Sequence, residues 1–307
     1  MKLDGRLFLT GGTGFFGKNL LEFLIENGSR AEITILSRDP EKFRRHFPAH
    51  SRLNIRFIRG DILDFPFPSE PFDCIIHGAT PADARMIAEQ PELIYRTITE
   101  GTLRILQLAE RSPSSRFLYI SSGAVYGPQP PDLPGFPEDW NGIPENAYGK
   151  GKLAAEKMCL DALPQCVIAR CFAFSGRYLP LEKHFAVGNF IGDVLHDRDI
   201  VIRGDGRTVR SYLDSRDLAE WLFRLLTEDL SGVYNVGSEH AVTIRELAET
   251  VLRVSGKKLG MRILGKPDPG PPHRYLPDIS KAKKAGLMQT VPLEESLRKM
   301  LDQERLP

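Results

Sequence analysis

The stretch that decides the fold is Leu7-Phe8-Leu9-Thr10-Gly11-Gly12-Thr13-Gly14-Phe15-Phe16-Gly17, close to the amino terminus. An apolar run of strand length leads there into a turn that carries glycines at fixed intervals. After the turn, apolar residues such as Leu20 and Leu24 recur at helical spacing, which predicts a helix over residues 17–27. A strand, a glycine-rich turn and a helix in direct succession indicate the start of a βαβ unit.

The same alternation continues through the first half of the chain. Short apolar runs predict strands at residues 32–37, 55–59, 74–77, 117–121 and 166–172, and periodic stretches predict helices at 92–111 and 148–162. Residues 127–145 are rich in Pro, Gly and Asp, and they predict a long surface loop. We therefore predict an α/β fold: a Rossmann-type doubly wound parallel sheet with a smaller, mixed α/β lobe at the carboxyl end.

The glycine-rich turn also predicts a ligand. One glycine permits the tight turn, one lets a diphosphate approach the backbone, and Gly17 lets the helix pack closely on the strand. The free N–H groups and the positive end of the helix then bind the diphosphate. This context predicts a dinucleotide cofactor, bound by Gly11, Gly14, Phe15, Phe16 and Gly17.

The end of the second predicted strand bears on which dinucleotide is bound. An acidic side chain there would accept hydrogen bonds from the ribose hydroxyls of NAD. This chain has Ser37 and Arg38 instead, followed by Asp39. Arg38 can form a fork with a 2′-phosphate and stack on the adenine, which favours NADP. NAD remains open if Arg38 is only a solvated loop charge.

Three further residues follow the third and fourth predicted strands. Asp61 suits the amino group of the adenine, and Ile62 can pack on the adenine ring. Ala79 is small and lets the cofactor lie close to the chain. His77 in the fourth strand is expected to be a packed histidine rather than a catalyst.

The catalytic prediction rests on Tyr148 and Lys152, which share one helix face at positions i and i+4. A phenol is a poor base at neutral pH, but a neighbouring ammonium and a positive nicotinamide favour the phenolate. Lys152 can also anchor the nicotinamide ribose. The strand at 117–121 delivers the hydroxyl of Ser122 to the carboxyl edge of the sheet, where ligands bind in such folds. Ser122 would hold the substrate oxygen while Tyr148 moves the proton.

The composition disfavours several classes of protein. The net charge of the 307 residues is about +1, so no global field favours nucleic acid or a membrane surface. No apolar stretch is long enough to span a bilayer and no secretory signal is visible, so we expect a cytoplasmic protein. Cys74, Cys159, Cys166 and Cys171 form no C-x-x-C pair, which favours buried thiols over disulfides or metal ligands. We expect no metal site.

Together these residues resemble the extended short-chain dehydrogenase/reductase family, the nucleotide-sugar epimerases and dehydratases. Thr10 to Gly17 is similar to the family's T-G-x-x-G-x-x-G, and residues 121–127 are similar to its S-S-x-x-V-Y-G. Pro144, Tyr148 and Lys152 match P-x-x-x-Y-x-x-x-K. The resemblance covers nearly the whole chain. It implies a nicotinamide cofactor, a nucleotide-diphosphate sugar as substrate, and a homodimer that forms through the helices near 92–111 and 148–162.

Arginines in the carboxyl-terminal lobe extend the resemblance. Residues 204–219 resemble the family's G-D-G…R-D-[FY]…D-[VL]-A stretch, in which the arginine, here Arg210, grips the diphosphate. Residues 274–281 resemble a late R-x-x-x-D-x-S-K, with Arg274 near the phosphate or the nucleotide. Two arginines suit a pyrophosphate because each guanidinium can form two hydrogen bonds with it. The implied substrate-binding set is Ser122, Asn189, Arg210 and Arg274. We expect a dinucleotide-binding domain over residues 1–174 and a substrate lobe over 175–307, with parts of 213–240 returning to the main domain.

The departures from the family pattern restrict the chemistry. The 4,6-dehydratases carry an Asp-Glu pair for elimination at the positions of Gly123 and Ala124, so dehydration is disfavoured here. Ala173 replaces an asparagine that touches the substrate phosphate, and Ile98 replaces another asparagine. Ser211 stands at the position of the usual aspartate. These changes predict that the substrate sits differently from that of a typical galactose epimerase.

The leading hypothesis is hydride transfer at C4 of a nucleotide-linked hexose, by an epimerase that retains its cofactor or by a 4-ketoreductase. Preference for NADP favours the reductase, whereas the Ser–Tyr–Lys set suits both. A 4,6-dehydratase is less favoured. A reductase of a non-nucleotide carbonyl would not need Arg210 and Arg274. A non-catalytic NADP-binding subunit would not need Tyr148 and Lys152.

Overall fold

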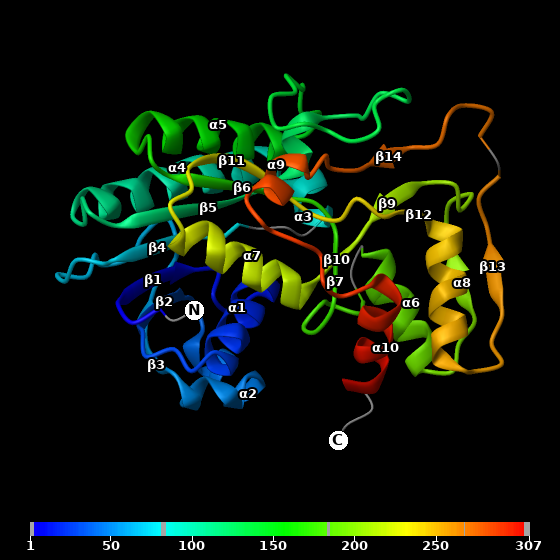
Figure 1. The fold of residues 1–307 in the computed structure, drawn as a ribbon, viewed down its shortest axis with the longest axis horizontal. Helices are drawn as coiled ribbons and strands as arrows, with labels where there is room; N and C mark the ends of the chain where they lie inside the picture. Colours follow the sequence, from blue (N-terminus) through cyan, green and yellow to red (C-terminus); the bar gives the residue numbers. More distant parts are fainter. Residues whose placement is uncertain (1–2, 81–83, 183–184, 267, 304–307) are drawn as a thin grey trace. The chain divides into compact units, whose positions relative to one another are not determined.

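The glycine-rich turn joins β1 (Arg6–Thr10) to α1 (Phe15–Glu26) in the computed structural model, which describes residues 3–80, 84–182, 185–266 and 268–303 (Figure 1). The helix begins two residues earlier than its apolar period predicts. Gly14 is the N-cap and has no side chain to cap the helix. The first N–H groups of α1 therefore have no side-chain acceptor at the cap, which is the property that an anion-binding helix terminus requires.

Seven strands form the central sheet in the order β11-β6-β5-β4-β1-β2-β3. Beyond β1 they are β2 (Glu32–Ser37), β3 (Asn54–Arg59), β4 (Cys74–His77), β5 (Arg116–Ser122), β6 (Val167–Cys171) and β11 (Gly232–Val236). The pairs β1–β2, β2–β3, β1–β4 and β4–β5 are parallel. This arrangement confirms the predicted Rossmann-type sheet. The chain order reverses beside β1, and this switch point is where such sheets bind ligands.

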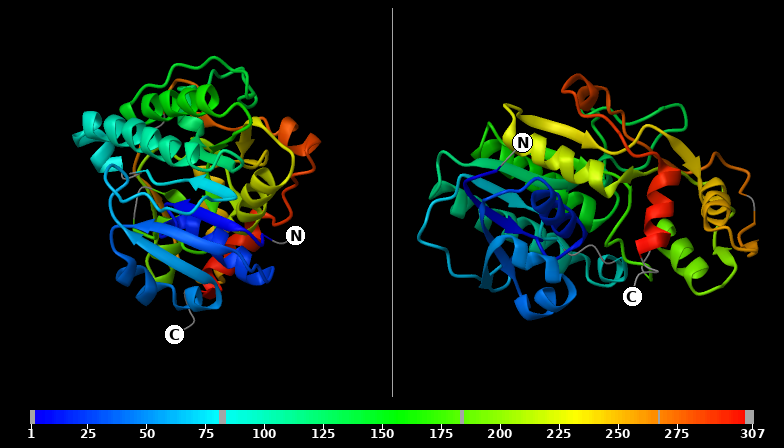
Figure 2. Two further views of the ribbon diagram at one scale, coloured as in Figure 1. Left: turned by 90° about the vertical axis from the view of Figure 1, so that its left-hand side faces the viewer. Right: turned by 60° about the horizontal axis from the view of Figure 1, so that its bottom comes forward.

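Helices cover both faces of the sheet (Figure 2). On one face lie α4 (Pro91–Glu110) and α5 (Ala147–Ala162), and on the other lie α1 and α7 (Ser215–Thr227). Gly151 of α5 lets α4 approach, because a Cβ added there would lie 3.1 Å from Ile98 Cδ1. Opposite, the rings of Phe23 and Phe223 lie 5.3 Å apart and join α1 to α7.

Burial on two faces explains the strand compositions. All four residues of β4 and all five of β6 are buried, so these strands read as continuous runs without alternation. Arg170 is also buried, although it is a cation in an otherwise apolar stretch of β6. The edge strand β3 alternates between exposed and half-buried positions.

The chain forms two compact units. The first comprises residues 3–80, 84–125, 144–170 and 219–234, and the second comprises residues 126–143, 171–182, 185–218, 235–266 and 268–303. Smaller elements of the first unit are α2 (Pro40–His46), η1 (Pro48–Arg52), α3 (Ala84–Glu89) and most of η2 (Gly123–Tyr126).

The second unit contains small sheets and helices. Its strands are β7 (Phe174–Ser175), β8 (Ile200–Ile202), β9 (Val209–Ser211), β10 (Leu213–Asp214), β12 (Ala241–Thr243), β13 (Met261–Ile263) and β14 (Arg274–Tyr275). Its helices are α6 (Ala186–Leu195), α8 (Ile244–Ser255), α9 (Ser280–Lys284) and α10 (Leu293–Gln303). The predicted loop before α5 contains buried Phe136, which bridges Pro277 and stacks on Tyr126 at 4.6 Å.

Candidate active site

Helix α5 carries the predicted acid–base pair near its start. Asn146 caps the helix, since its side chain accepts a hydrogen bond from Gly149 N at 2.9 Å. Tyr148 and Lys152 follow one turn apart, and Lys152 Nζ lies 5.9 Å from the centre of the Tyr148 ring. The structure thus places the ammonium beside the phenol, as their spacing predicts.

Lys152 is held in one position by buried acceptors. Only 2% of the residue is exposed, and Nζ donates to Thr80 Oγ1 at 2.8 Å and to the Ile120 carbonyl at 2.7 Å. Nζ also lies 4.7 Å from the centre of the Tyr119 ring, a cation–π distance. Because a buried ammonium is costly without such partners, these contacts stabilise the charged form beside Tyr148.

Ser122 is the last residue of β5 and is half-buried. Its Oγ accepts a hydrogen bond from Ala124 N at 3.2 Å. A hydroxyl that accepts one backbone hydrogen bond retains a hydrogen to donate to a substrate oxygen. Neither Gly123 nor Ala124 supplies a carboxylate here.

A buried ion pair lies one helical turn beyond Lys152. Glu156 accepts from Arg170 at 2.7 and 3.1 Å, and it also accepts from the hydroxyl of Ser121. Glu156 and Arg170 are both buried, so the pair connects α5 to β6 inside the unit. We did not predict this contact. Two features of the sequence indicate it: the i+4 spacing from Lys152 to Glu156, and the arginine inside an apolar strand.

The glycine-rich turn fits a dinucleotide. Gly11 adopts φ +76°, and a Cβ there would lie 2.7 Å from the carbonyl carbon and oxygen of Gly78. A Cβ at Gly17 would lie 2.3 Å from Gly12 Cα, so only glycine permits this approach of helix to turn. Gly14 is exposed at the start of α1. Phe15 and Phe16 are half-buried in the first turn of α1, their rings 5.5 Å apart. Among the described residues, a Cβ added at Gly14 would meet only the carbonyl oxygen of Gly11, at 3.5 Å.

Two of the residues predicted for the adenosine end, Arg38 and Asp61, lie close together. Arg38 NH1 lies 3.9 Å from Asp61 Oδ2, and 84% of the Arg38 side chain is exposed. Ser37 is buried, and its Oγ accepts a hydrogen bond from Asp39 N. Ile62 is buried in the core beside Gly101 of α4. Ala79 follows β4 in the segment that Gly11 contacts.

In the second unit, the neighbouring parallel strands β9 and β14 carry Arg210 and Arg274 at successive positions of the ladder, with Arg274 paired to Val209. Arg210 pairs in register with Tyr275, the neighbour of Arg274, and its guanidinium lies 5.4 Å from the centre of the Tyr275 ring. Burial lowers the pKa of Arg210. Arg274 Nε is buried without a hydrogen-bond partner. Neither arginine forms an ion pair with a residue in the described part of the chain. Asn189 lies half-buried in α6.

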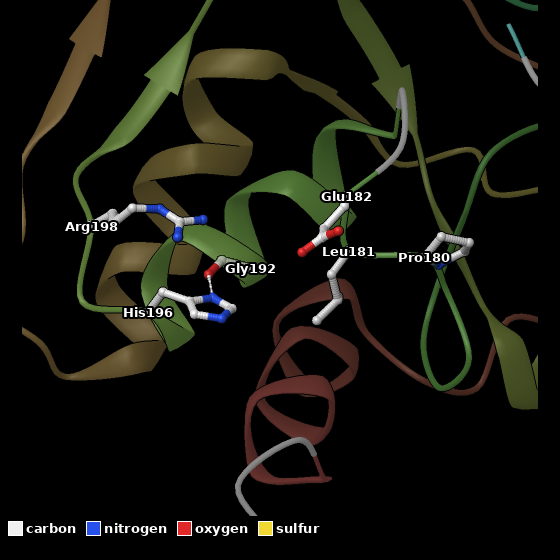
Figure 3. Close-up of a pocket in the computed structure, with 6 residues that line it drawn as sticks. All are labelled: Pro180, Leu181, Glu182, Gly192, His196 and Arg198. Carbon is white, nitrogen blue, oxygen red and sulfur yellow. Dashed lines mark hydrogen bonds between the residues drawn. The ribbon is translucent and has the colours of Figure 1, made fainter. Parts of the chain in front are cut away.

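A pocket of about 360 Å³ opens elsewhere in the second unit (Figure 3). Glu182 lies on one side of it, and His196 and Arg198 lie on the other. His196 Nδ1 donates to the Gly192 carbonyl at 2.7 Å, and Arg198 pairs with Asp193 at 3.1 Å. None of the residues predicted for the active site lines this pocket.

The four cysteines are buried and free. Burial raises the pKa of Cys74 and of Cys166 to about 11, so these thiols stay protonated at neutral pH. Among the described residues, no group of three or more His, Cys, Asp or Glu side chains is arranged to hold a metal ion. Within the same residues, no helix combines the length and apolar character needed to cross a membrane.

The doubly wound sheet, the glycine cradle at its switch point and the Tyr148–Lys152 pair define a nicotinamide-dependent enzyme of the extended short-chain dehydrogenase type. Comparison with known proteins gives the family. Residues 7–237 match the model of the NAD dependent epimerase/dehydratase family, and the chain belongs to this family.

Three relatives show the range of its members. The chain is 32% identical to UDP-glucuronic acid decarboxylase 1 of Arabidopsis thaliana, over 98% of this chain and 70% of that protein. It superposes with a TM-score of 0.85 on the UDP-N-acetylglucosamine 4-epimerase of Methanobrevibacter ruminantium, at 25% identity and 98% coverage of both chains. It superposes with a TM-score of 0.79 on RMD of Pseudomonas aeruginosa, solved with NADPH, at 27% identity and 97% and 98% coverage. The chain is therefore a nucleotide-sugar-modifying enzyme of this family.

Proposed function

We propose that the protein transfers a hydride at C4 of a nucleoside-diphosphate hexose, as a 4-epimerase or as a 4-ketoreductase. The observation that carries this proposal is the buried ammonium of Lys152, fixed by Thr80 and Ile120 beside the ring of Tyr148. A fixed cation beside a phenol favours the phenolate and so equips Tyr148 to exchange a proton with the C4 hydroxyl.

Each residue of the set has a separate task. Ser122 donates a hydrogen bond to the C4 oxygen and orients it. Tyr148 Oη takes the hydroxyl proton during oxidation and returns it during reduction. Lys152 holds the phenolate charge and hydrogen-bonds the nicotinamide ribose. A bound nicotinamide cofactor supplies the acceptor or donor for the hydride.

The arginines of the second unit support a nucleotide-diphosphate substrate. Arg210 and Arg274 lie on neighbouring strands without a carboxylate partner in the described residues. A single guanidinium can form two hydrogen bonds with phosphate oxygens. A reductase of small carbonyl compounds would have no use for this pair. Asn189 completes the proposed substrate set.

For the cofactor we propose NADP, bound by the glycine turn and by Arg38. Arg38 directly follows β2 and has an exposed guanidinium where an NAD enzyme would carry a carboxylate. Asp61, at 3.9 Å, would accept from the adenine amino group and orient Arg38. Ser37, Ile62 and Ala79 complete the proposed contact set.

Native mass spectrometry of the purified protein, followed by identification of the released cofactor, tests the cofactor and divides the two activities. Retained NAD(H) would favour an epimerase that recycles its hydride and would overturn NADP. An empty protein that binds added NADPH and reduces a nucleotide 4-keto sugar would support the ketoreductase. A protein that binds neither dinucleotide would refute the proposal.

The relatives favour a second candidate, decarboxylation of a nucleotide-linked uronic acid. Oxidation at C4 of such a sugar places a ketone β to the C6 carboxylate, and a β-keto acid loses CO₂ without a carboxylate base. The absence of an acid at Gly123 and Ala124 disfavours elimination but does not obstruct this step. Incubation with UDP-glucuronic acid and the bound or added cofactor tests it: release of CO₂ would support decarboxylation, and unchanged substrate would exclude it.

We also propose a homodimer in the cytoplasm, formed through α4 and α5. Helix α4 exposes Leu93, Tyr95 and Leu103 to the extent of 40%, 42% and 49%, an apolar surface that a partner subunit would cover. Light scattering at micromolar concentration tests this. Dimers that Leu103→Glu converts to monomers would support the assignment, and a monomeric wild type would refute it.

A further inference from the structure

Thr10, the last residue of β1, carries an unusual number of hydrogen bonds on its hydroxyl. Thr10 Oγ1 lies 2.9 Å from His77 Nδ1. It also accepts from Ala79 N at 3.0 Å and, at 3.1 Å, from Gly78 N, whose hydrogen is shared with the Thr10 carbonyl at 3.2 Å. The hydroxyl therefore connects the end of β1 to the end of β4 and to the segment that follows it.

The number of donors and acceptors fixes the direction of the remaining hydrogen bond. A threonine hydroxyl has two lone pairs and one hydrogen. The Ala79 N–H and the shared Gly78 N–H are both directed at the lone pairs, so the hydrogen is left for donation to His77 Nδ1. Nδ1 is then an acceptor, and the proton of the neutral ring lies on Nε2, which donates to Thr102 Oγ1 at 3.1 Å.

The surroundings of the ring also require it to be neutral. His77 is buried, and burial together with the charge of Lys152 lowers its pKa to about 3. Tyr119 lies between these groups, with its ring centre 5.3 Å from that of His77 and 4.7 Å from Lys152 Nζ. An imidazolium would add a second buried cation close to Lys152 and would oppose the Thr10 hydroxyl with a second donor.

The segment held by Thr10 belongs to the proposed cofactor site. Gly11 follows Thr10, and a Cβ at Gly11 would lie 2.7 Å from Gly78 and 2.9 Å from Ala79 N. The turn after β1 and the segment after β4 thus touch at the switch point of the sheet, where the dinucleotide is proposed to bind. A shift of one relative to the other would change the shape of the cradle.

We propose that His77 is a positioning residue for the cofactor: as the neutral Nε2–H tautomer it accepts the Thr10 hydroxyl proton and keeps the turns after β1 and β4 in register for the dinucleotide. The positioning role rests on the proposed cofactor site at these turns. The assignment of the His77 tautomer is independent of that proposal.

Long-range ¹⁵N–¹H correlation spectra of histidine-labelled protein test the tautomer directly, and the signal missing from His77→Asn assigns His77. We expect an unprotonated Nδ1 and a protonated Nε2 at neutral pH. A proton on Nδ1, or an imidazolium, would overturn the proposal whether or not the protein binds a cofactor.

Cofactor titrations of Thr10 variants test the positioning role. Thr10→Val removes the hydroxyl at nearly constant shape and should weaken dinucleotide binding about tenfold, the worth of one disrupted buried hydrogen-bond set. Thr10→Ser keeps the hydroxyl and should bind within about threefold of the wild type. Thr34→Val is the matched control: it removes a buried strand hydroxyl that accepts from Arg56 but lies outside this network.

Loss of affinity in Thr10→Val alone, with thermal stability lowered similarly in Thr10→Val and Thr34→Val, would support positioning. Equal affinities for Thr10→Val and wild type, or equal losses in Thr34→Val, would overturn it. A wild type that binds no dinucleotide would refute the proposed function and this role together, while the spectra would still decide the tautomer.

Discussion

The buried charged and titratable side chains of the two candidate sites differ in their partners. In the first unit, Lys152 has two oxygen acceptors, Glu156 has Arg170 and Ser121, and His77 has Thr10 and Thr102. In the second unit, no described residue accepts from the buried Nε of Arg274, and within the same residues Arg210 donates to the carbonyl of Val209. A protein normally pairs its buried polar groups.

This difference separates two kinds of site. Lys152 is fixed by protein acceptors alone, so it positions its charge beside Tyr148 before any ligand arrives. Arg210 and Arg274 have no carboxylate partner among the described residues, and the anion that we propose for them is the diphosphate of the substrate. Variants of the first set should therefore affect catalysis or stability, and variants of the second should affect substrate affinity.

The largest effect should follow Tyr148→Phe, which removes the proposed proton carrier beside Lys152. Turnover should fall by about two to four orders of magnitude, the usual worth of a positioned acid–base group. Cofactor affinity should stay within about threefold, because Lys152 and the glycine turn remain. Steady-state kinetics and cofactor titration measure both quantities, and near-normal turnover would remove Tyr148 from the mechanism.

Glu156→Gln should produce the next largest effect, on stability. The variant leaves Arg170 buried without a counter-charge, which costs about 3–5 kcal/mol of unfolding free energy. Glu89→Gln is the control, since it breaks an exposed pair with Arg85 and should cost less than about 1 kcal/mol. Urea unfolding of both variants gives the comparison, and equal losses would show that the buried network is not needed for stability.

His77 predicts a pH dependence of stability. Its pKa is about 3 in the folded protein because of burial and Lys152, against about 6.5 when unfolded. The unfolded state therefore binds more protons between these values. This residue should lower the free energy of unfolding by a few kcal/mol as the pH falls from 6.5 towards 3. The contribution of His77 to this pH dependence is the difference between the unfolding free energies of wild type and His77→Asn at each pH, because both proteins have the same carboxylates. Parallel pH profiles would contradict a neutral buried ring.

Arg274→Met tests the incomplete pair of the second unit. We expect KM for the nucleotide sugar to rise about tenfold or more, since one charge-assisted contact to phosphate is lost. Because Arg274 Nε has no partner to lose, the free energy of unfolding should not fall by more than about 1 kcal/mol. Kinetics and urea unfolding of the same preparation separate the two, and a large loss of stability at unchanged KM would assign Arg274 to the fold.

The smallest effect should follow Arg38→Asp at the exposed adenosine end. The preference for NADP over NAD should fall about tenfold, as a guanidinium–phosphate contact is replaced by repulsion. Paired titrations with the two dinucleotides measure it. An unchanged preference for NADP over NAD would show that Arg38 is an ordinary surface charge without a role in cofactor binding.

The sequence predicted the parts of the molecule that depend on local rules. Apolar runs located the first six strands of the sheet to within about one residue, because buried strands are continuous in hydrophobicity. The i, i+4 spacing placed Tyr148 and Lys152 on one face, and the glycine pattern located the turn.

Contacts between distant segments were missed for a physical reason. Lys152 donates hydrogen bonds to Thr80 and Ile120, and Thr10 is hydrogen-bonded to His77. These partners are separated in the sequence by 32 to 72 residues. No local period encodes such partners. For the Glu156–Arg170 pair, Arg170 was a visible signal beside the spacing from Lys152 to Glu156, since a cation inside a buried strand requires a counter-charge.

Transfer of deuterium tests the central claim most directly. The protein is freed of any retained cofactor and mixed with a nucleoside-diphosphate 4-keto hexose and NADPH or NADH deuterated at C4 of the nicotinamide. The sugar product is then analysed by NMR and mass spectrometry. We predict deuterium at C4 of the sugar with wild type and a loss of about two orders of magnitude or more with Tyr148→Phe. Absence of deuterium from the nucleotide sugar, with transfer instead to a small carbonyl compound or to none, would contradict hydride transfer at C4 as the function of this protein.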